Sequence, residues 1–322
     1  MMVPVLDALA RQYPEARISV VSRPVMQSVA ELLPGNVEFV GINPRDYAGL
    51  CGLERLYRQL RSLQPTHVCD LHDVLRTKYL RMRFHLDGIP VTRIHKDRCA
   101  RRRFLHSKHK TQQTTTFARY ADALRRLDFP VEIDPYVPFC LCGSVPQADD
   151  TGRGDEARIG IAPFAAHRGK VYPLPQMERV AQLLCERGAR VFLFGAGTDE
   201  AGICDEWAQK YHGVQSMVGR LANLAEEMQF MASLNCLVSM DSANMHLASL
   251  AGVRVVSVWG ATHPMAGFMG WGQSERDAVQ LPLPCRPCSI YGNRPCRYSD
   301  WRCLSGIAPE QIVDRALNAA GA

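Results

Sequence analysis

The sequence lacks a long hydrophobic run, an internal repeat and a low-complexity tract. No stretch approaches the roughly 18 consecutive apolar residues of a membrane-spanning helix, which argues against an integral membrane protein. The residues that follow Met1 are neither basic nor continuously apolar, so they do not form a secretory signal. Without such a signal, the 12 cysteines indicate a reducing compartment rather than a disulfide scaffold. We therefore expect a cytoplasmic protein without a transmembrane segment.

The positive charge is concentrated in one region. The formal net charge is +6, and twelve Lys and Arg but only two Asp lie between Arg76 and Lys110. Such a region attracts phosphates. It lacks cations interleaved with aromatic residues and a nucleic-acid-reading motif, so nucleic acid is not the expected partner.

Two interpretations of this basic region remain, and both treat residues 98–110 as a loop. One is a solvated face that keeps the protein soluble. The other is an acceptor-side patch at Arg101, Arg102 and Arg103 for an anionic glycolipid, with the protein peripheral on the inner membrane. Each cation near an anionic leaflet contributes on the order of 1 kcal/mol.

Length and composition indicate two soluble domains. The 322 residues are 47% apolar and 22% charged, which suits a globular chain with two cores. Strand-like runs alternate with helical patterns, which favours an α/β fold. A polar, proline-containing stretch separates an N-terminal domain at 1–146 from a C-terminal domain at 157–306, and a closing helix occupies 307–322. The expected strands are 16–21, 37–40, 66–71, 89–94, 157–162, 190–194, 234–239 and 253–260, and the expected helices are 1–13, 23–33, 50–63, 76–84, 116–127, 176–187, 224–234 and 309–320.

The densest polar pattern lies between Met240 and Pro264. Asp241 and Ser242 follow one strand-like run, and a short helical pattern opens at His246. In a parallel sheet this loop lies where ligands bind, and Asp241 would stand at a helix N-terminus that favours a phosphate. A helix cap at Asp241 and a packed His246 are the plain alternatives. The polar turn at 260–264, after the next strand, favours a site.

A second loop follows the strand expected at 157–162. The small residues Ala165 and Ala166 allow backbone N–H groups to approach a diphosphate closely. His167 lies in the same loop, and Lys170 would act as a point charge on a diphosphate leaving group. A surface lysine on an ordinary β–α loop is the alternative.

The sequence D-S-A-N-M-H-L-A-S-L-A-G, followed by V-V-S-V-W-G-A-T-H-P, resembles the signature of the bacterial heptosyltransferase family. That signature has Asp, a small residue that is usually Gly, two variable residues and His, and later Gly-Pro-Thr. Here Ala243 replaces the Gly and Ala261 replaces the Pro. The resemblance extends over nearly the whole chain and implies a GT-B glycosyltransferase, in which two Rossmann-like domains face each other across a cleft.

The resemblance implies inverting transfer of a heptose from an ADP-sugar to a lipopolysaccharide core acceptor, without a catalytic metal. Lys170, Asp241 and His246 would carry the catalytic roles, and Glu200 would hold the ribose unless it only caps a helix. The remaining donor-binding residues would be Ala165, Ala166, His167, Gly195, Arg220, Ser242, Ala243, Met245 and Thr262.

The N-terminus departs from the family pattern. Family chains begin with a strand and a Gly-Asp loop before the first helix, whereas here the helical pattern starts at Met1. The Asp of that loop is the residue the family is thought to use as its base. We therefore expect about twenty further residues upstream, one strand and one loop. The alternative is a true start with a different catalytic arrangement, for which His167 is a poor substitute base.

Four cysteines cluster near the C-terminus, in the pattern Cys285-x2-Cys288-x7-Cys296-x6-Cys303. Four thiolates in a short Pro- and Gly-rich segment suggest a structural zinc or iron site. Free buried thiols are the alternative. Two functional rivals also stay open: a GT-B enzyme or epimerase that uses a uridine donor, and a nucleotide-sugar-binding paralogue without turnover.

Overall fold

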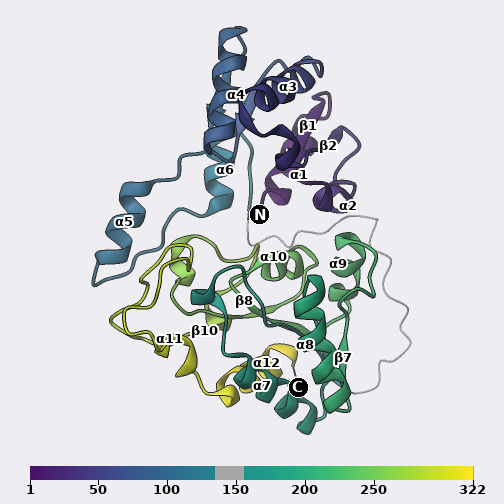
Figure 1. The fold of residues 1–322 in the computed structure, drawn as a ribbon, viewed down its shortest axis with the longest axis vertical. Coiled ribbons are helices and arrows are strands. Elements are labelled where there is room, and N and C mark those ends of the chain that lie inside the picture. Colours follow the sequence, from purple (N-terminus) through teal and green to yellow (C-terminus); the bar gives the residue numbers. More distant parts are fainter. Residues whose placement is uncertain (135–155, 322) are drawn as a thin grey trace. The chain divides into compact units, whose positions relative to one another are not determined.

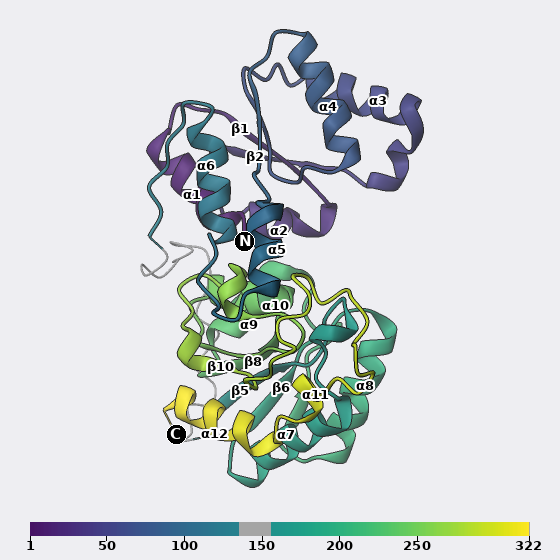
Figure 2. The same cartoon turned by 90° about the vertical axis from the view of Figure 1, so that its left-hand side faces the viewer.

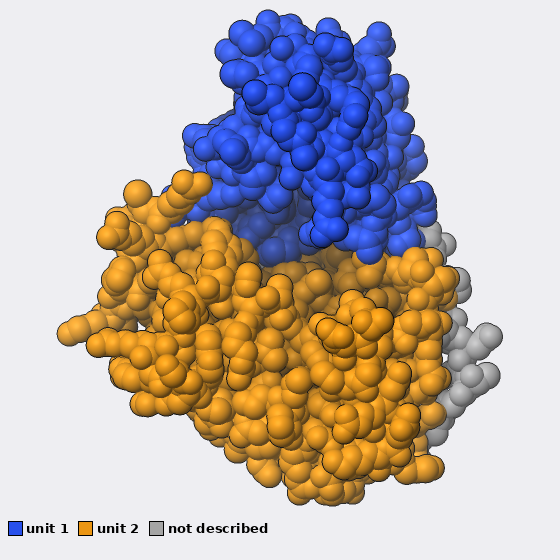
Figure 3. Space-filling model, viewed as in Figure 1, with its two compact units in different colours: residues 1–97, 114–134 blue, residues 98–113, 135–322 orange. Residues whose placement is uncertain are grey.

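The computed structural model describes residues 1–134 and 156–321, and the chain divides into two compact units (Figure 3). Unit 1 comprises residues 1–97 and 114–134, and unit 2 comprises residues 98–113 and 135–322. The segment 98–113 therefore belongs with the C-terminal half of the chain, although the sequence division places it in the N-terminal domain. The expected boundary between residues 146 and 157 falls almost entirely outside the described residues.

Unit 1, drawn mostly in purple and blue in Figure 1, contains two separate parallel strand pairs. In the first pair Ile18 lies opposite Val37, and in the second Val68 lies opposite Val91. Among the described residues, no strand joins the two pairs into one sheet. The strands are β1 (Ile18–Ser22), β2 (Val37–Gly41), β3 (Val68–Asp70) and β4 (Val91–Arg93), and the helices are α1 (Val3–Gln12), α2 (Gln27–Ala30), α3 (Gly49–Arg61), α4 (Leu75–Leu86) and α6 (Thr116–Arg125).

The helices α3 and α4 share one core of unit 1. Leu56, Tyr57 and Leu60 of α3 are buried with Phe84 of α4. Leu56 and Leu60 are four residues apart, so both lie on one helical face, as an amphipathic helix requires. The ring of Tyr57 packs edge-on against that of Phe84 at 5.2 Å between centroids. This packing fixes α4 beside α3.

Unit 2 is built on one six-stranded parallel sheet with the order β10-β9-β8-β5-β6-β7 (Figure 2). Its strands are β5 (Arg158–Ala162), β6 (Arg190–Leu193), β7 (Val214–Ser216), β8 (Cys236–Met240), β9 (Val255–Val258) and β10 (Ala278–Val279). Its helices are α5 (Arg98–His106), α7 (Leu174–Glu186), α8 (Gly197–Lys210), α9 (Leu224–Ala232), α10 (Ala243–Leu250), α11 (Arg302–Ser305) and α12 (Pro309–Ala320).

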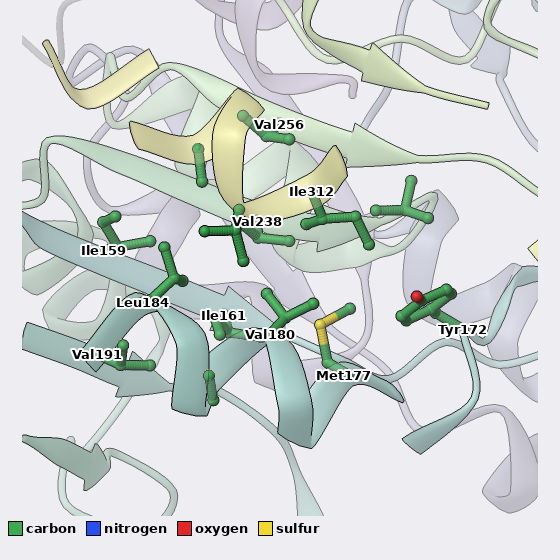
Figure 4. Packing of buried hydrophobic residues seen from close by; sticks show 14 of the residues in the cluster. Ile159, Ile161, Tyr172, Met177, Val180, Leu184, Val191, Val238, Val256 and Ile312 are labelled. Atoms are coloured by element: carbon green, nitrogen blue, oxygen red, sulfur yellow. The ribbon is translucent and has the colours of Figure 1, made fainter. Parts of the chain in front are cut away.

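The main core of unit 2 lies between this sheet and the helices α7 and α12 (Figure 4). Ile159 and Ile161 of β5 point into it, together with Met177 of α7 and Ile312 of α12, and all four are fully buried. Strands of a parallel sheet covered on both faces read as continuous apolar runs, which is why β5, β8 and β9 were visible in the sequence. The closing helix begins at Pro309, as predicted.

Two expected elements are wrong in detail. Residues 98–110 are not a loop, because Arg98–His106 forms α5. Long unbranched cations favour a helix, and Phe104 anchors this one by packing with Ala266 and Ile290. The helix expected to open at His246 begins at Ala243 instead. Across residues 1–134 and 156–321, no helix combines the length and apolarity needed to cross a membrane.

Candidate functional site

The predicted ligand loops of unit 2 lie at one edge of its sheet. The strands β8, β5 and β6 are neighbours and run parallel. The loops that follow these three strands therefore lie side by side, and they contain Asp241, Lys170 and Glu200. Ligands of open parallel sheets bind at this edge.

Lys170 and Asp241 form an ion pair at the centre of this edge. The ammonium Nζ of Lys170 lies 2.9 Å from Oδ2 of Asp241, with 16% and 5% of the two side chains exposed. Lys170 ends the short 3-10 turn Arg168–Lys170, and Asp241 directly follows β8. The pair joins the loops after β5 and β8 and leaves the cation accessible for an anionic ligand.

The N-terminus of α10 lies directly after Asp241. Ser242 occupies the N-cap position without capping the helix through its side chain, and Ala243 is the exposed first helical residue. The first N–H groups of a helix have no partner within the helix and carry its positive dipole end. Together with Lys170, this end of α10 is suited to a phosphate group.

Nδ1 of His246 and Oγ1 of Thr262 are among the buried polar atoms that have no hydrogen-bond partner in the described part of the chain. Buried polar atoms are nearly always satisfied in folded proteins, so such atoms are candidates for ligand contacts. Burial lowers the pKa of His246 well below its usual range, and Lys170 acts in the same direction. His246 is therefore neutral near pH 7.

The loop after β5 meets the loop after β6. A Cβ atom added at Gly195 would lie 3.0 Å from the ring of Phe164 and 3.1 Å from Oε2 of Glu200. Ala165 and Ala166 follow Phe164, and in the described part of the chain their N–H groups donate no hydrogen bond. His167 is exposed beside them. These two loops therefore present free N–H groups next to a carboxylate.

Glu200 also fulfils its alternative role. Its Oε2 accepts a hydrogen bond from the N–H of Ala196 at 2.7 Å, just before α8 begins. This contact is a helix cap, and it leaves Oε1 of the carboxylate for a further hydrogen bond. The cap and a contact with a ligand hydroxyl are compatible.

Other predicted residues lie apart from this centre. Met245 is fully buried in the core, and Arg220 is exposed beyond the edge strand β7. The guanidinium of Arg101 is stacked over the ring of Phe268 at 5.1 Å and over Tyr291 at 5.5 Å. Arg101 is thus largely structural, whereas Arg102 and Arg103 are exposed.

Gly292 was missed in the sequence. A Cβ atom at Gly292, whose φ is +73°, would lie 2.6 Å from Cγ of Lys170. The Cys-rich segment therefore packs against the side chain of Lys170. A glycine at position 292 leaves room for this contact because it has no side chain. A glycine in a Gly- and Pro-rich region was visible, but its distant neighbour was not.

Arg286 was missed as well. Its guanidinium is buried and donates hydrogen bonds to the carbonyl oxygens of Gly260 and Thr262. These bonds hold the turn after β9 against the Cys-rich segment. Burial lowers the pKa of the neighbouring His263 to about 4, and Arg286 and Lys110 act in the same direction.

The four C-terminal cysteines do not form a metal-holding group as they are placed. No cluster of three or more His, Cys, Asp or Glu side chains suited to a metal ion occurs in the described part of the chain. Cys303 is buried in the core, and the other three members, Cys285, Cys288 and Cys296, are partly exposed. The four-thiolate site stays a prediction, which metal analysis of the purified protein would test.

Comparison with known proteins identifies the family of this chain. The model of glycosyltransferase family 9 (heptosyltransferase) matches residues 54–298. The chain belongs to this family. Two curated relatives are lipooligosaccharide heptosyltransferase 2 of Campylobacter jejuni serotype O:2, 27% identical over 131 residues, and its counterpart from serotype O:6, 24% identical over 127 residues. These matches span 40% and 39% of the relatives' own lengths.

Solved structures of family members share the fold. A family 9 glycosyl transferase of Veillonella parvula has a TM-score of 0.69 at 17% identity, with 99% of this chain and 92% of that chain covered. The ADP-heptose heptosyltransferase II of E. coli has a TM-score of 0.65 at 18% identity, with coverages of 99% and 94%. E. coli heptosyltransferase WaaC with ADP has a TM-score of 0.64 at 15% identity, with coverages of 98% and 97%. The GT-B heptosyltransferase fold predicted from the sequence is confirmed.

Proposed function

We propose that this glycosyltransferase moves a heptose from an ADP-sugar to a lipopolysaccharide core acceptor, with inversion at the anomeric carbon. The observation that carries the donor assignment is the Lys170–Asp241 pair at the N-terminus of α10. A cation next to unpaired N–H groups is what a diphosphate requires. Of the similar E. coli structures, one contains ADP and the other is an ADP-heptose heptosyltransferase. This similarity favours an ADP-sugar over a UDP-sugar as the donor.

The proposed reaction is a direct displacement. An acceptor hydroxyl attacks the anomeric carbon, the bond from that carbon to the diphosphate oxygen breaks, and the proton of the hydroxyl passes to a general base. Negative charge develops on the departing diphosphate, where Lys170 and the N–H groups of the Ala165–Ala166 loop would stabilise it. Neutral His246 would donate or accept one hydrogen bond that orients the sugar. Glu200 would accept from a ribose hydroxyl.

The test of the donor assignment is calorimetric titration of the full chain with ADP and with UDP. Tighter binding of ADP supports the proposal, and tighter binding of UDP would replace it with a uridine-dependent enzyme. Turnover is then followed by mass spectrometry of an acceptor oligosaccharide incubated with the protein and an ADP-sugar. ADP binding without transfer would identify a binding paralogue.

A further inference from the structure

The helix α4 leaves a row of apolar side chains in solvent. Leu75, Met82 and Leu86 are 82%, 52% and 72% exposed. Their spacings of seven and four residues place them on one face of the helix. Phe84 is the buried residue of α4. Soluble proteins rarely leave large apolar side chains in a continuous row without a partner.

A third exposed leucine lies on the neighbouring helix α3. The hydroxyl of Tyr79 donates to Glu54 at 2.8 Å, and Arg61 donates to Asp87 at 2.8 Å, so α3 and α4 run in the same direction. Leu50, which is 73% exposed, therefore lies at the same end of the helix pair as Leu75. We call Leu50, Leu75, Met82 and Leu86 the apolar row.

The surroundings of the apolar row are positively charged. The helix α4 carries Arg76, Lys78, Arg81 and Arg83 and no acidic residue. The exposed Lys78 lies between Leu75 and Met82 along the row. Arg83 pairs with Glu54, and Arg81 pairs with Asp70 and Asp73. Arg76 and Lys78 form no ion pair with a described residue, so they supply the uncompensated positive charge of α4. The surface therefore combines exposed leucines with an excess of cations.

We propose that the apolar row docks the protein onto a bilayer that contains anionic lipids. Helices that lie in a membrane interface insert apolar side chains and keep cations at the headgroups. A second copy of this chain is a poorer occupant, since two surfaces of like charge would meet. The proposal rests on the proposed function only in that a lipid-linked acceptor requires a membrane. It also moves membrane contact from the arginines of α5 to α4.

The test is co-sedimentation of the full chain with vesicles of phosphatidylcholine alone and with about one third phosphatidylglycerol. We expect binding to the anionic vesicles, weakened at least tenfold by the combined substitution Leu75→Ser, Met82→Ser and Leu86→Ser. Lys78→Glu alone should weaken it less. These side chains are exposed, so circular dichroism and the melting temperature should not change. The matched control is Arg102→Glu with Arg103→Glu, which should keep most of the binding.

Three outcomes would overturn the proposal. In the first, the wild type and the triple variant bind equally well, and neither distinguishes the two kinds of vesicle. In the second, only the α5 control loses vesicle binding. In the third, the triple substitution dissociates a dimer but leaves vesicle binding unchanged. ADP titration of the same variants separates this inference from the donor assignment. Unchanged ADP affinity with lost vesicle binding supports docking, whereas absent ADP binding in every variant counts against the proposed function alone.

Discussion

Lys170 reaches across the sheet edge to Asp241, with 2.9 Å between the ammonium and the carboxylate oxygen. The two residues are 71 positions apart in sequence, but their loops follow the neighbouring strands β5 and β8. A bound diphosphate would compete with Asp241 for this ammonium. The strength of that competition decides how tightly a nucleotide is held.

Replacing Lys170 by Ala should weaken ADP binding by about tenfold to a hundredfold, because a charge-assisted hydrogen bond contributes roughly 1.5–3 kcal/mol. Calorimetric titration measures the change. The control is Lys210→Ala, which removes the exposed partner of Glu178 on the same unit and should leave ADP affinity unchanged. Equal affinities for ADP in the wild type and the Lys170 variant would remove the lysine from the donor site.

The substitution Gly292→Ala should weaken ADP binding about tenfold through displacement of Lys170, whose Cγ would lie 2.6 Å from the new methyl group. Gly188→Ala is the matched control. Gly188 has a similar φ of +83° but no atom within 4 Å of an added Cβ, so both variants share the backbone strain and only one disturbs the lysine. Identical losses of affinity in the two variants would point to strain alone.

Neutralising Asp241 should destabilise the fold. Asp241→Asn leaves the ammonium of Lys170 without its carboxylate, and we expect the free energy of unfolding to fall by about 1–3 kcal/mol. The double variant with Lys170→Met should recover part of that loss, because no unpaired charge remains. Urea denaturation of the wild type, both single variants and the double variant gives the coupling energy. Additive losses would mean that the two side chains do not interact in solution.

Stability should fall between about pH 6.5 and pH 4 in part because of His263. Its folded pKa of about 4 lies below the unfolded value near 6.5. The unfolded chain therefore takes up a proton first as the pH falls, and folding loses free energy until the folded form also protonates. Above pH 6.5 both forms are neutral and the effect vanishes.

His263→Asn tests this assignment. The His263 ring accepts a hydrogen bond from the N–H of Met265, and an asparagine at this cap position can accept it without titrating. The slope of unfolding free energy against pH, measured by denaturation between pH 4.5 and 6.5, should be smaller in the variant. An unchanged slope would assign the acid sensitivity to other groups.

The sequence allowed much of the fold and part of the site to be predicted, for identifiable reasons. The strands of unit 2 are continuous apolar runs, and Pro309 marks the start of α12. The sequence predicted that Asp241 and Lys170 lie near each other, because polar residues directly after buried strands gather at one edge of a parallel sheet. Their meeting in an ion pair was beyond the sequence, since it depends on the order β8-β5.

Other features failed in the sequence because they depend on tertiary contacts. The basic composition of 98–110 suggested a loop, but the contact of Phe104 with Ala266 and Ile290 stabilises a helix. The helix expected to open at His246 begins at Ala243, and the side chain of Met245 is fully buried. The contact between Gly292 and Lys170 has no signal in the local sequence of either residue.

The membership of α5 in unit 2 has a practical consequence for dissecting the protein. Residues on both sides of 98–113 belong to unit 1, so the polypeptide passes between the units more than once. A fragment that starts at residue 156 would lose α5 and expose Ala266 and Ile290, the partners of Phe104. A single cut therefore does not separate the two units. To express unit 2 alone, residues 98–113 have to be joined to the C-terminal fragment.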